Sequence, residues 1–407
     1  MRTLEFLRQN APFLAAGALL TFCSSFGQTF LISVFAGVIR ADFGLSDGDW
    51  GRLYGIGTLA SGLVMIWAGV LTDHFRVRYL GAVVLVMLAG ACLAMAFAPG
   101  AWALPIVIFA LRFAGQGMTS HIAVVAMARW FVASRGRAIS VATIGYAIGE
   151  ALMPLFIVFM FDVVDWRMLW VGFAIFLILT VPLLSILLRL ERTPQSVAEE
   201  SQSFGMFGRH WSRKEAMRHW LFWVMVPAIF GPSAWITSLF FQQVHLAETK
   251  GWSHAALVAL FPLYTTVAIV STIASGFVVD RYGSARSIPF VSVPMILGFV
   301  VIGMSETLFS AAIGLCFVAM GHGLNATFPN VFWAEFYGTR NIGGIKSLAT
   351  AIMVFGSAFG PWITGGLIDA GIPFEDQTFG IALLFVASMA LVWVGVRRAS
   401  PALSAPA

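Results

Sequence analysis

Long apolar stretches separated by short polar connections run along almost the whole chain. A helix needs about 20 mostly apolar residues to cross the hydrocarbon layer of a membrane. Because that layer holds no water, the backbone must satisfy its own hydrogen bonds, so each such stretch is predicted to be helical. Twelve stretches qualify, over residues 13–37, 50–72, 79–98, 101–127, 137–161, 168–189, 220–245, 253–279, 287–304, 307–331, 345–368 and 377–396. The pattern predicts an all-α integral membrane protein with twelve transmembrane helices.

Short motifs recur at corresponding places in the two halves of the chain. GVLTD at 69–73 is matched by GFVVD at 276–280, 207 residues later, and GQG at 115–117 is matched by GHG at 321–323, 206 residues later. Duplicated apolar halves are typical of transporters that bind their substrate between two bundles. We therefore predict two pseudo-symmetric six-helix bundles over 1–189 and 219–398, a cytoplasmic linker over 190–218 and a disordered tail over 399–407.

Composition and charge agree with a membrane location. The chain is 59% hydrophobic and 11% charged, whereas soluble domains carry about 25% charged residues. With both termini in the cytoplasm, most of the 24 Lys and Arg residues fall on that side, as the positive-inside rule requires. Those expected outside are Arg40, Arg52, Arg167 and Lys250. The net charge of +5 therefore indicates topology and contact with the lipid bilayer, and not a nucleic-acid partner.

No sequence feature points to a metal, a cofactor or ATP. The three cysteines lie in apolar stretches without metal-ligand spacing. A Walker-type glycine loop ending in GK[ST] is absent from the sequence. We therefore expect transport driven by a gradient and no bound cofactor.

Two charged side chains stand in the middle of predicted helices. Arg112 lies half-way along the fourth stretch and Glu150 half-way along the fifth, which runs in the opposite direction, so similar depths are expected. A charge at mid-membrane costs a few kcal/mol or more unless it is paired or hydrated. Two interpretations stay open. The residues form a structural ion pair, or Arg112 binds an anionic substrate while Glu150 takes up a proton.

Polar side chains recur in every third predicted helix. Arg112, Gln116 and Thr119 have the i, i+4, i+7 spacing that places them on one face of an α-helix. The duplication puts His322 at the position of Gln116, with Asn325 three residues later. Histidine can change charge near neutral pH, so His322 is a candidate for both substrate binding and proton coupling. The other candidates for substrate binding are Gln28, Trp235 and Gln242. For any single polar residue, simple helix packing remains an alternative.

The two repeated loops resemble the signature of the major facilitator superfamily. In that family the loop between helices two and three reads G-x-L-x-D-R-x-G-R-R. Residues 69–78 share its Gly, Leu, Asp and final Arg, and they depart from it at His74 and Arg76. The second copy, 276–285, keeps the Gly and Asp-Arg but has Ser284 and Ala285 where basic residues are usual.

Two helix motifs carry the same resemblance. Arg112 followed by Gln116-Gly117 resembles the helix-four motif of the family. The residues that resemble a loosened helix-five motif, into which Glu150 is inserted, are Gly145, Gly149 and Pro154. The resemblance implies a monomer with the two-bundle fold and a cavity lined by helices one, four, seven and ten.

The resemblance also implies a gate at the cytoplasmic face. Asp73 would contact a basic residue such as Arg129 and release it as the bundles rock, with Asp280 and Arg281 as the counterpart in the second half. The run RWF at 129–131 followed by RGRA at 135–138 is similar to a bacterial branch near the monocarboxylate and oxalate–formate porters. That similarity implies the inner membrane of a bacterium and an anionic substrate.

These observations predict a secondary active transporter, and not an enzyme. Its substrate would be a small organic anion such as a monocarboxylate, moved by alternating access with protons as the candidate coupling ion. An efflux pump for drugs or toxic compounds is the first alternative, favoured by Glu150 and the 37 phenylalanines and opposed by Arg112. An integral membrane enzyme is a remote alternative, because the predicted outer loops are too short for a catalytic domain.

Overall fold

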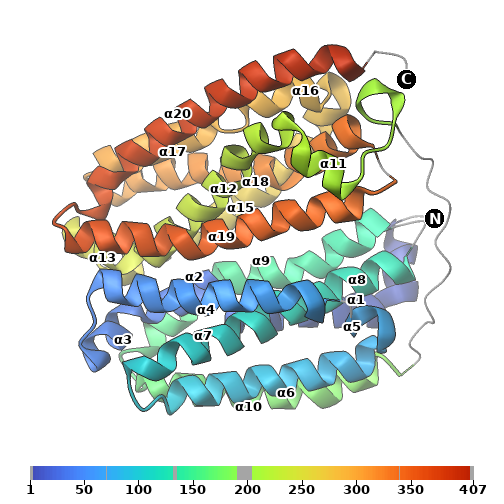
Figure 1. The fold of residues 1–407 in the computed structure, drawn as a ribbon. Coiled ribbons are helices and arrows are strands. Elements are labelled where there is room, and N and C mark those ends of the chain that lie inside the picture. The colour runs from blue at the N-terminus through green and yellow to red at the C-terminus, as the bar shows by residue number, and fades with distance from the viewer. Residues whose placement is uncertain (1–2, 70, 132–134, 190–203, 339, 404–407) are drawn as a thin grey trace. The chain divides into compact units, whose positions relative to one another are not determined.

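A computed structural model describes residues 3–69, 71–131, 135–189, 204–338 and 340–403 (Figure 1). These residues form helices and turns, and no strand occurs among them. The chain divides into two compact units, Met1–Glu200 and Ser201–Ala407. The all-helical fold predicted from the apolar pattern is confirmed.

The N-terminal unit holds the first six spans, and irregular turns interrupt two of them. Its first span consists of several short pieces, and its fourth contains a π-helical segment. The helices are α1 (Thr3–Cys23), α2 (Thr29–Ile32), α3 (Ala36–Phe43), α4 (Asp47–Ala68), α5 (Leu71–His74), α6 (Val77–Ala96), α7 (Leu104–Leu111), η4 (Arg112–Thr119), α8 (Ser120–Trp130), α9 (Arg135–Met160) and α10 (Trp166–Leu187).

The C-terminal unit holds the other six spans and the chain that leads into them. Its helices are η6 (Met206–Gly208), α11 (Arg213–Arg218), α12 (Trp220–Phe241), α13 (Gln243–Thr249), α14 (His254–Val258), α15 (Phe261–Tyr282), α16 (Ser284–Ser287), η7 (Ile288–Phe290), α17 (Val293–Met304), α18 (Leu308–Tyr337), α19 (Ile342–Asp369), α20 (Phe374–Ala399) and η8 (Ser400–Leu403).

Both units pair their spans in the same way. In the N-terminal unit α1 packs on α9, α4 packs on α7 and η4, and α6 packs on α10. In the C-terminal unit α12 packs on α19, α15 on α18 and α17 on α20. In each unit the first span therefore meets the fifth, the second meets the fourth and the third meets the sixth. This repeated pairing is the structural counterpart of the repeated motifs.

Ten described helices are long and apolar enough to cross a membrane, or up to eleven if the bent first span counts as one. The difference from the predicted twelve lies in α4, which has 22 residues but is not apolar enough to be counted. Asp47, Asp49 and Arg52 in its first two turns, together with several glycines, dilute its apolar residues.

Large apolar side chains are exposed on the third, sixth, ninth and twelfth spans. Val83 of α6, Leu179 of α10, Leu297 of α17 and Leu383 of α20 are examples. Soluble monomers rarely expose apolar patches of this extent, whereas a bilayer covers them. The exposed side chains therefore agree with a multi-pass membrane protein.

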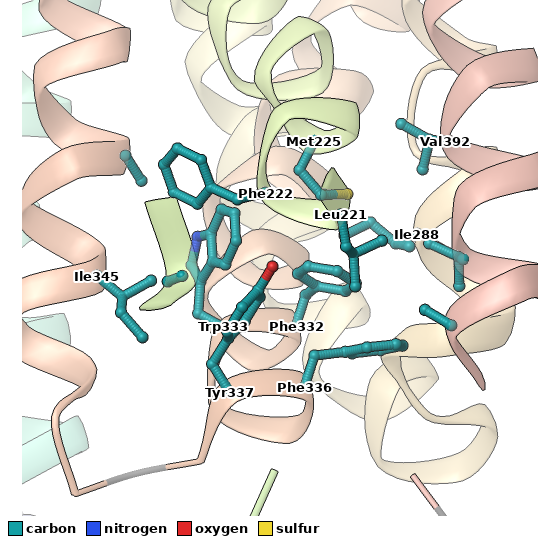
Figure 2. Packing of buried hydrophobic residues seen from close by; sticks show 14 of the residues in the cluster. Leu221, Phe222, Met225, Ile288, Phe332, Trp333, Phe336, Tyr337, Ile345 and Val392 are labelled. Atoms are coloured by element: carbon teal, nitrogen blue, oxygen red, sulfur yellow. The ribbon is translucent and has the colours of Figure 1, made fainter. Parts of the chain in front are cut away.

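A buried cluster in the C-terminal unit holds the start of α12 against the end of α18 (Figure 2). Phe222 of α12 lies on Trp333 of α18, with ring centroids 5.5 Å apart. The cluster also includes Met206 and Trp211, from the second part of the predicted linker. That part belongs to the C-terminal unit, while the linker residues 190–203 lie outside the described part of the chain.

The end of the chain differs from the disordered tail that was predicted. Ala399 is the last residue of α20, and Ser400–Leu403 continue it as a 3₁₀ turn. Ala402 and Leu403 pack against the buried cluster, because their apolar side chains can cover its edge. Residues 404–407 lie outside the described part.

Candidate functional site

The first span is broken in its middle. After the turn Ser24–Gly27, Gln28 has an extended backbone, with φ −87° and ψ 152°, and the helix resumes at Thr29. The parts before and after the break are bent by 46°. Ser24 promotes the break because its hydroxyl donates a hydrogen bond of 2.7 Å to the carbonyl of Thr21. Such a side-chain bond competes with the regular backbone hydrogen bonds of an α-helix. Broken spans are where transporters place backbone groups next to substrate.

The fourth span is also irregular, at the same place. Residues Arg112–Thr119 form a π-helix, and the hydroxyl of Thr119 bonds the carbonyl of Ala114, five residues earlier, at 2.6 Å. Such wide turns are rare and are frequently found at functional sites. Here the wide turn lies directly against the break, because Gly115 contacts Gly27 backbone to backbone.

Arg112 is a buried cation held by neutral groups. Its side chain is 2% exposed. Nη1 donates to the hydroxyl of Thr29 at 3.0 Å and lies 3.4 Å from the carbonyl oxygen of Gly27, so it bridges the break at Gln28. The guanidinium lies 5.5 Å from the ring centroid of Tyr54, whose hydroxyl bonds that of Thr29 at 2.6 Å. Nε of Arg112 has no hydrogen-bond partner among the described residues.

Glu150 is buried near the same break, on α9. It is 4% exposed, and the hydroxyl of Tyr146 donates to its Oε1 at 3.0 Å. Gly149 brings α9 close to the break, because a Cβ there would lie 1.9 Å from the hydroxyl of Ser25. Arg112 donates to Thr29 and Gly27, while Glu150 accepts from Tyr146, so acceptors hold one side chain and a donor holds the other.

Arg112, Gln116 and Thr119 were predicted to share one face, and in the structure they differ in exposure and in contacts. Gln116 is exposed, whereas Arg112 and Thr119 are buried. The hydroxyl of Thr119 donates its hydrogen bond within its own helix, to the carbonyl of Ala114. The prediction assumed an α-helical period, and the wider turn of the π-helix moves Thr119, seven residues after Arg112, away from it. Gln28, 7% exposed, is placed by the break itself.

The candidates of the C-terminal unit lie in two places. His322 of α18 is half-buried, and its Nδ1 pairs with the hydroxyl of Tyr264 of α15 at 2.8 Å. Asn325 is half-buried on the same helix. Gln242, at the end of α12, is 2% exposed and donates to the hydroxyl of Thr364 of α19 at 3.2 Å. Trp235, also on α12, is 8% exposed.

The predicted gate is described only in part. Arg129, at the end of α8, donates from Nη1 to the carbonyl of Thr72 at 2.5 Å, so it reaches the residue next to Asp73. The side chains of Asp73 and Asp280 lie outside the described part. Arg281 is exposed, 5.5 Å from the ring centroid of its neighbour Tyr282.

Sequence reasoning did not predict the contacts of three residues. Glu335 lies 206 residues after Arg129 and accepts hydrogen bonds from the backbone nitrogen and hydroxyl of Ser284, at 3.2 and 2.5 Å. Glu335 could have been predicted from the offset between the repeats, because it occupies the position that corresponds to Arg129. Thr29 and Tyr54 were missed as partners of Arg112, because no spacing links residues on three different helices.

Comparisons with known proteins agree with the fold. A sequence model described as Major Facilitator Superfamily matches residues 17–361. A protein named probable plastidic glucose transporter 1, from Arabidopsis thaliana, is 27% identical over 128 residues, which are 31% of this chain and 23% of that protein. The match thus spans less than a quarter of that relative.

Solved structures resemble the chain along its whole length. A bacterial homolog of the human lysosomal transporter Spinster, inward-facing and unoccupied, has a TM-score of 0.74 and 16% identity over 98% of this chain and 99% of that one. A point mutant of the nucleoside transporter NupG has a TM-score of 0.69 and 13% identity over 95% of this chain and 99% of that one. At these identities the likeness concerns the fold alone.

Proposed function

The chain belongs to the major facilitator superfamily, and from that premise we propose that it transports small organic anions by alternating access. The family consists of membrane transporters of small molecules, so the predicted class, a transporter and not an enzyme, is confirmed. The anionic substrate, the driving ion and the direction are part of the proposal.

The buried guanidinium of Arg112 is the observation that supports an anionic substrate. A cation away from water is costly unless an opposite charge compensates it. The contacts that hold Arg112 among the described residues are a hydroxyl, a carbonyl oxygen and an aromatic ring, all of them neutral. A carboxylate of the substrate would supply the missing charge, and the fork of the guanidinium suits a carboxylate.

Proton coupling is proposed for Glu150 and His322. Both are titratable groups inside spans, and each has a tyrosine hydroxyl as partner, Tyr146 for Glu150 and Tyr264 for His322. A proton taken up with the substrate would offset the negative charge of an anion during its passage. We further propose the bacterial inner membrane, cytoplasmic termini, a monomer and a gate around Arg129 and Asp73.

The test is uptake of a panel of monocarboxylates into proteoliposomes with an imposed pH gradient. Truncating one side of a buried charge contact costs about 2–5 kcal/mol, so Arg112→Gln should weaken apparent affinity about 30-fold or more. The apparent affinity of Arg112→Lys should lie between those of the parent protein and Arg112→Gln, because lysine keeps the charge but lacks the forked guanidinium. Glu150→Gln should uncouple uptake from the pH gradient.

The matched control is Arg52→Gln, because Arg52 is exposed and its ion pair with Asp49 is at the surface. It should transport like the parent protein. If Arg112→Gln and Glu150→Gln also transport like the parent while folding normally, the proposed roles are wrong.

Efflux of lipophilic compounds is the second candidate function. It is favoured by the buried acid Glu150 and by the aromatic pair beside it, Phe30 and Tyr146, whose ring centroids are 5.6 Å apart. Expression would then raise resistance to lipophilic cations instead of supporting growth on an organic acid, and Arg112→Gln would leave that resistance intact.

A further inference from the structure

The chain that leads into the seventh span has one buried side and one basic, aromatic side. Met206, Trp211 and Phe222 lie in the buried cluster of Figure 2. Residues between and beside them are exposed. We call six of these exposed residues the collar: Phe207, Arg213, Lys214, Arg218, Trp220 and Trp223.

The collar is carried on a fixed backbone. The nitrogen of Trp211 donates to the carbonyl of Tyr337, at the end of α18, at 3.0 Å. Gly205 is so close to α18 that a Cβ there would lie 2.5 Å from the carbonyl oxygen of Phe336. Ser212 and Glu215 form a capping box that starts α11. The cations of α11 are therefore presented at set positions, which lowers the entropy that a ligand must remove on binding.

Among the described residues, no acidic side chain neutralises the cations of the collar. In the described part of the chain, Arg213, Lys214 and Arg218 have no acidic partner. Glu215 is the acid of α11, and both the nitrogen and the hydroxyl of Ser212 donate to its Oε2 at 2.7 Å. These bonds lower the pKa of Glu215 and direct its charge toward the start of the helix.

The last helix adds charge beside the collar. A Cβ on Gly395 of α20 would lie 3.5 Å from the ring of Trp220, so α20 runs against this residue. Arg397 and Arg398 follow on α20 and are exposed. The guanidinium of Arg397 lies 4.8 Å from the ring centroid of Trp393, which is itself 44% exposed.

The aromatic side chains of the collar are substantially exposed. Phe207 has φ 59° and ψ 29°, a left-handed conformation that bulky residues rarely adopt, and its ring is 45% exposed. Trp223 is 57% exposed, with its indole nitrogen fixed by the carbonyl of Met217 at 2.8 Å. Trp220 is the first residue of a helix apolar enough to span a membrane.

We propose that the collar binds the head groups of anionic phospholipids. Cations next to a span attract the phosphates of an anionic leaflet, and tryptophan rings are favoured at the level of the head groups. A soluble polyanion would match the cations but would leave the exposed rings without a partner. The proposal does not depend on which substrate the protein transports.

The full-length protein in nanodiscs tests this, with phosphatidylcholine alone or mixed with phosphatidylglycerol. Native mass spectrometry should show phosphatidylglycerol retained by the parent protein, and its thermal unfolding should shift upward with this lipid. Each cation near an anionic surface contributes about fivefold in affinity. The triple variant R213Q/K214Q/R218Q should therefore bind phosphatidylglycerol about a hundredfold more weakly than the parent protein. Added salt should reduce this difference in affinity.

Two further variants keep the result interpretable. The control R8Q/R76Q/R189Q removes the same charge from exposed positions of the N-terminal unit and should keep its phosphatidylglycerol. Phe207→Gly relieves the left-handed strain, so it should fold at least as well as the parent protein and still bind this lipid more weakly. Equal retention by the collar variants and the parent protein would overturn the proposal. So would equal stabilisation by inorganic phosphate, since that result would mean a site for free anions.

Discussion

Gly27 and Gly115 are in direct backbone contact, and neither position has room for a side chain. A Cβ on Gly115 would lie 2.6 Å from Cα of Gly27, and a Cβ on Gly27 would lie 2.1 Å from the carbonyl oxygen of Leu111. The contact joins the break of the first span to the π-helical segment that begins with Arg112. It therefore sets the position of the guanidinium relative to the Gly27 carbonyl.

Gly115→Ala should destabilise the protein and disturb Arg112. The added methyl group meets backbone atoms that cannot rotate away, and overpacking of this kind costs about 1–3 kcal/mol. Thermal unfolding in detergent measures the loss, and transport should fall further than stability alone explains. Gly90→Ala is the control, because a Cβ there meets nothing within 4 Å. It should stabilise α6 by about 0.5–1 kcal/mol. Equal melting temperatures for the two variants would contradict the expectation.

Tyr54→Phe should weaken the support of Arg112 without removing any charge. The variant deletes the hydroxyl that bonds Thr29 at 2.6 Å in a fully buried place, which costs about 0.5–1.5 kcal/mol. Apparent substrate affinity should fall together with the melting temperature. Thr58→Val, one turn further along α4, is the matched control. The buried hydroxyl of Thr58 has no partner among the described residues, so its loss should be neutral or stabilising.

His219 should make the protein less stable as the pH falls. Burial, and secondly the charge of Arg209, lower the pKa of His219, which contacts Trp211 at 4.8 Å between ring centroids. The unfolded chain therefore binds a proton more readily than the folded protein does, so stability is lost as the pH drops below about 6.5, the ordinary histidine value.

His219→Gln should flatten this part of the stability profile. The measurement is the melting temperature between neutral and mildly acidic pH, compared between the parent protein and the variant. The difference should be small, because His219 is only half-buried and solvent screens its charge. A parallel course of the two profiles would show that His219 does not contribute.

The sequence was sufficient for the fold because span length, duplication and charge asymmetry each bear on it. The apolar pattern predicted where the spans lie. The repeat of Gly69 at Gly276 indicated two related halves, and the two units do pair their helices in the same way. The burial of Arg112 followed from its place in the middle of an apolar stretch.

The geometry around Arg112 could not be predicted, because it depends on where two spans stop being α-helical. Gln28 is extended and Arg112–Thr119 is π-helical, and neither departure changes the period of the apolar residues enough to be seen. The partners Thr29 and Tyr54 come from different helices, so only the packing brings them to the guanidinium.

In each unit one cation connects the first, third and sixth spans. The cation is on the sixth span in the N-terminal unit and at the end of the first span in the C-terminal unit, and the acid is on the other of these two spans. In the N-terminal unit Arg167, at the start of α10, donates to the carbonyl of Ala96 at 2.9 Å and pairs with Asp42 at 2.8 Å. In the C-terminal unit Lys250 donates to the carbonyl of Gly303, 207 residues after Ala96, at 3.1 Å, and lies 2.9 Å from Glu375, at the start of α20. The shared feature is a cation on the last carbonyls of the third span of each unit, where it also meets the negative end of the helix dipole.

Lys250→Met should therefore destabilise the protein although Lys250 lies far along the chain from the candidate site. The variant leaves the Gly303 carbonyl and the carboxylate of Glu375 without their cation in a place where the two side chains are only 15% and 25% exposed, which costs about 1–2 kcal/mol. Arg167→Met should cost less, because its pair is 32% and 41% exposed. Arg52→Met breaks a pair at 55% and 45% exposure and should change stability by less than about 0.5 kcal/mol. Thermal unfolding of the three variants in one detergent should rank them in this order. Equal losses for Lys250→Met and Arg52→Met would mean that the carbonyl contact adds nothing to an ordinary surface ion pair.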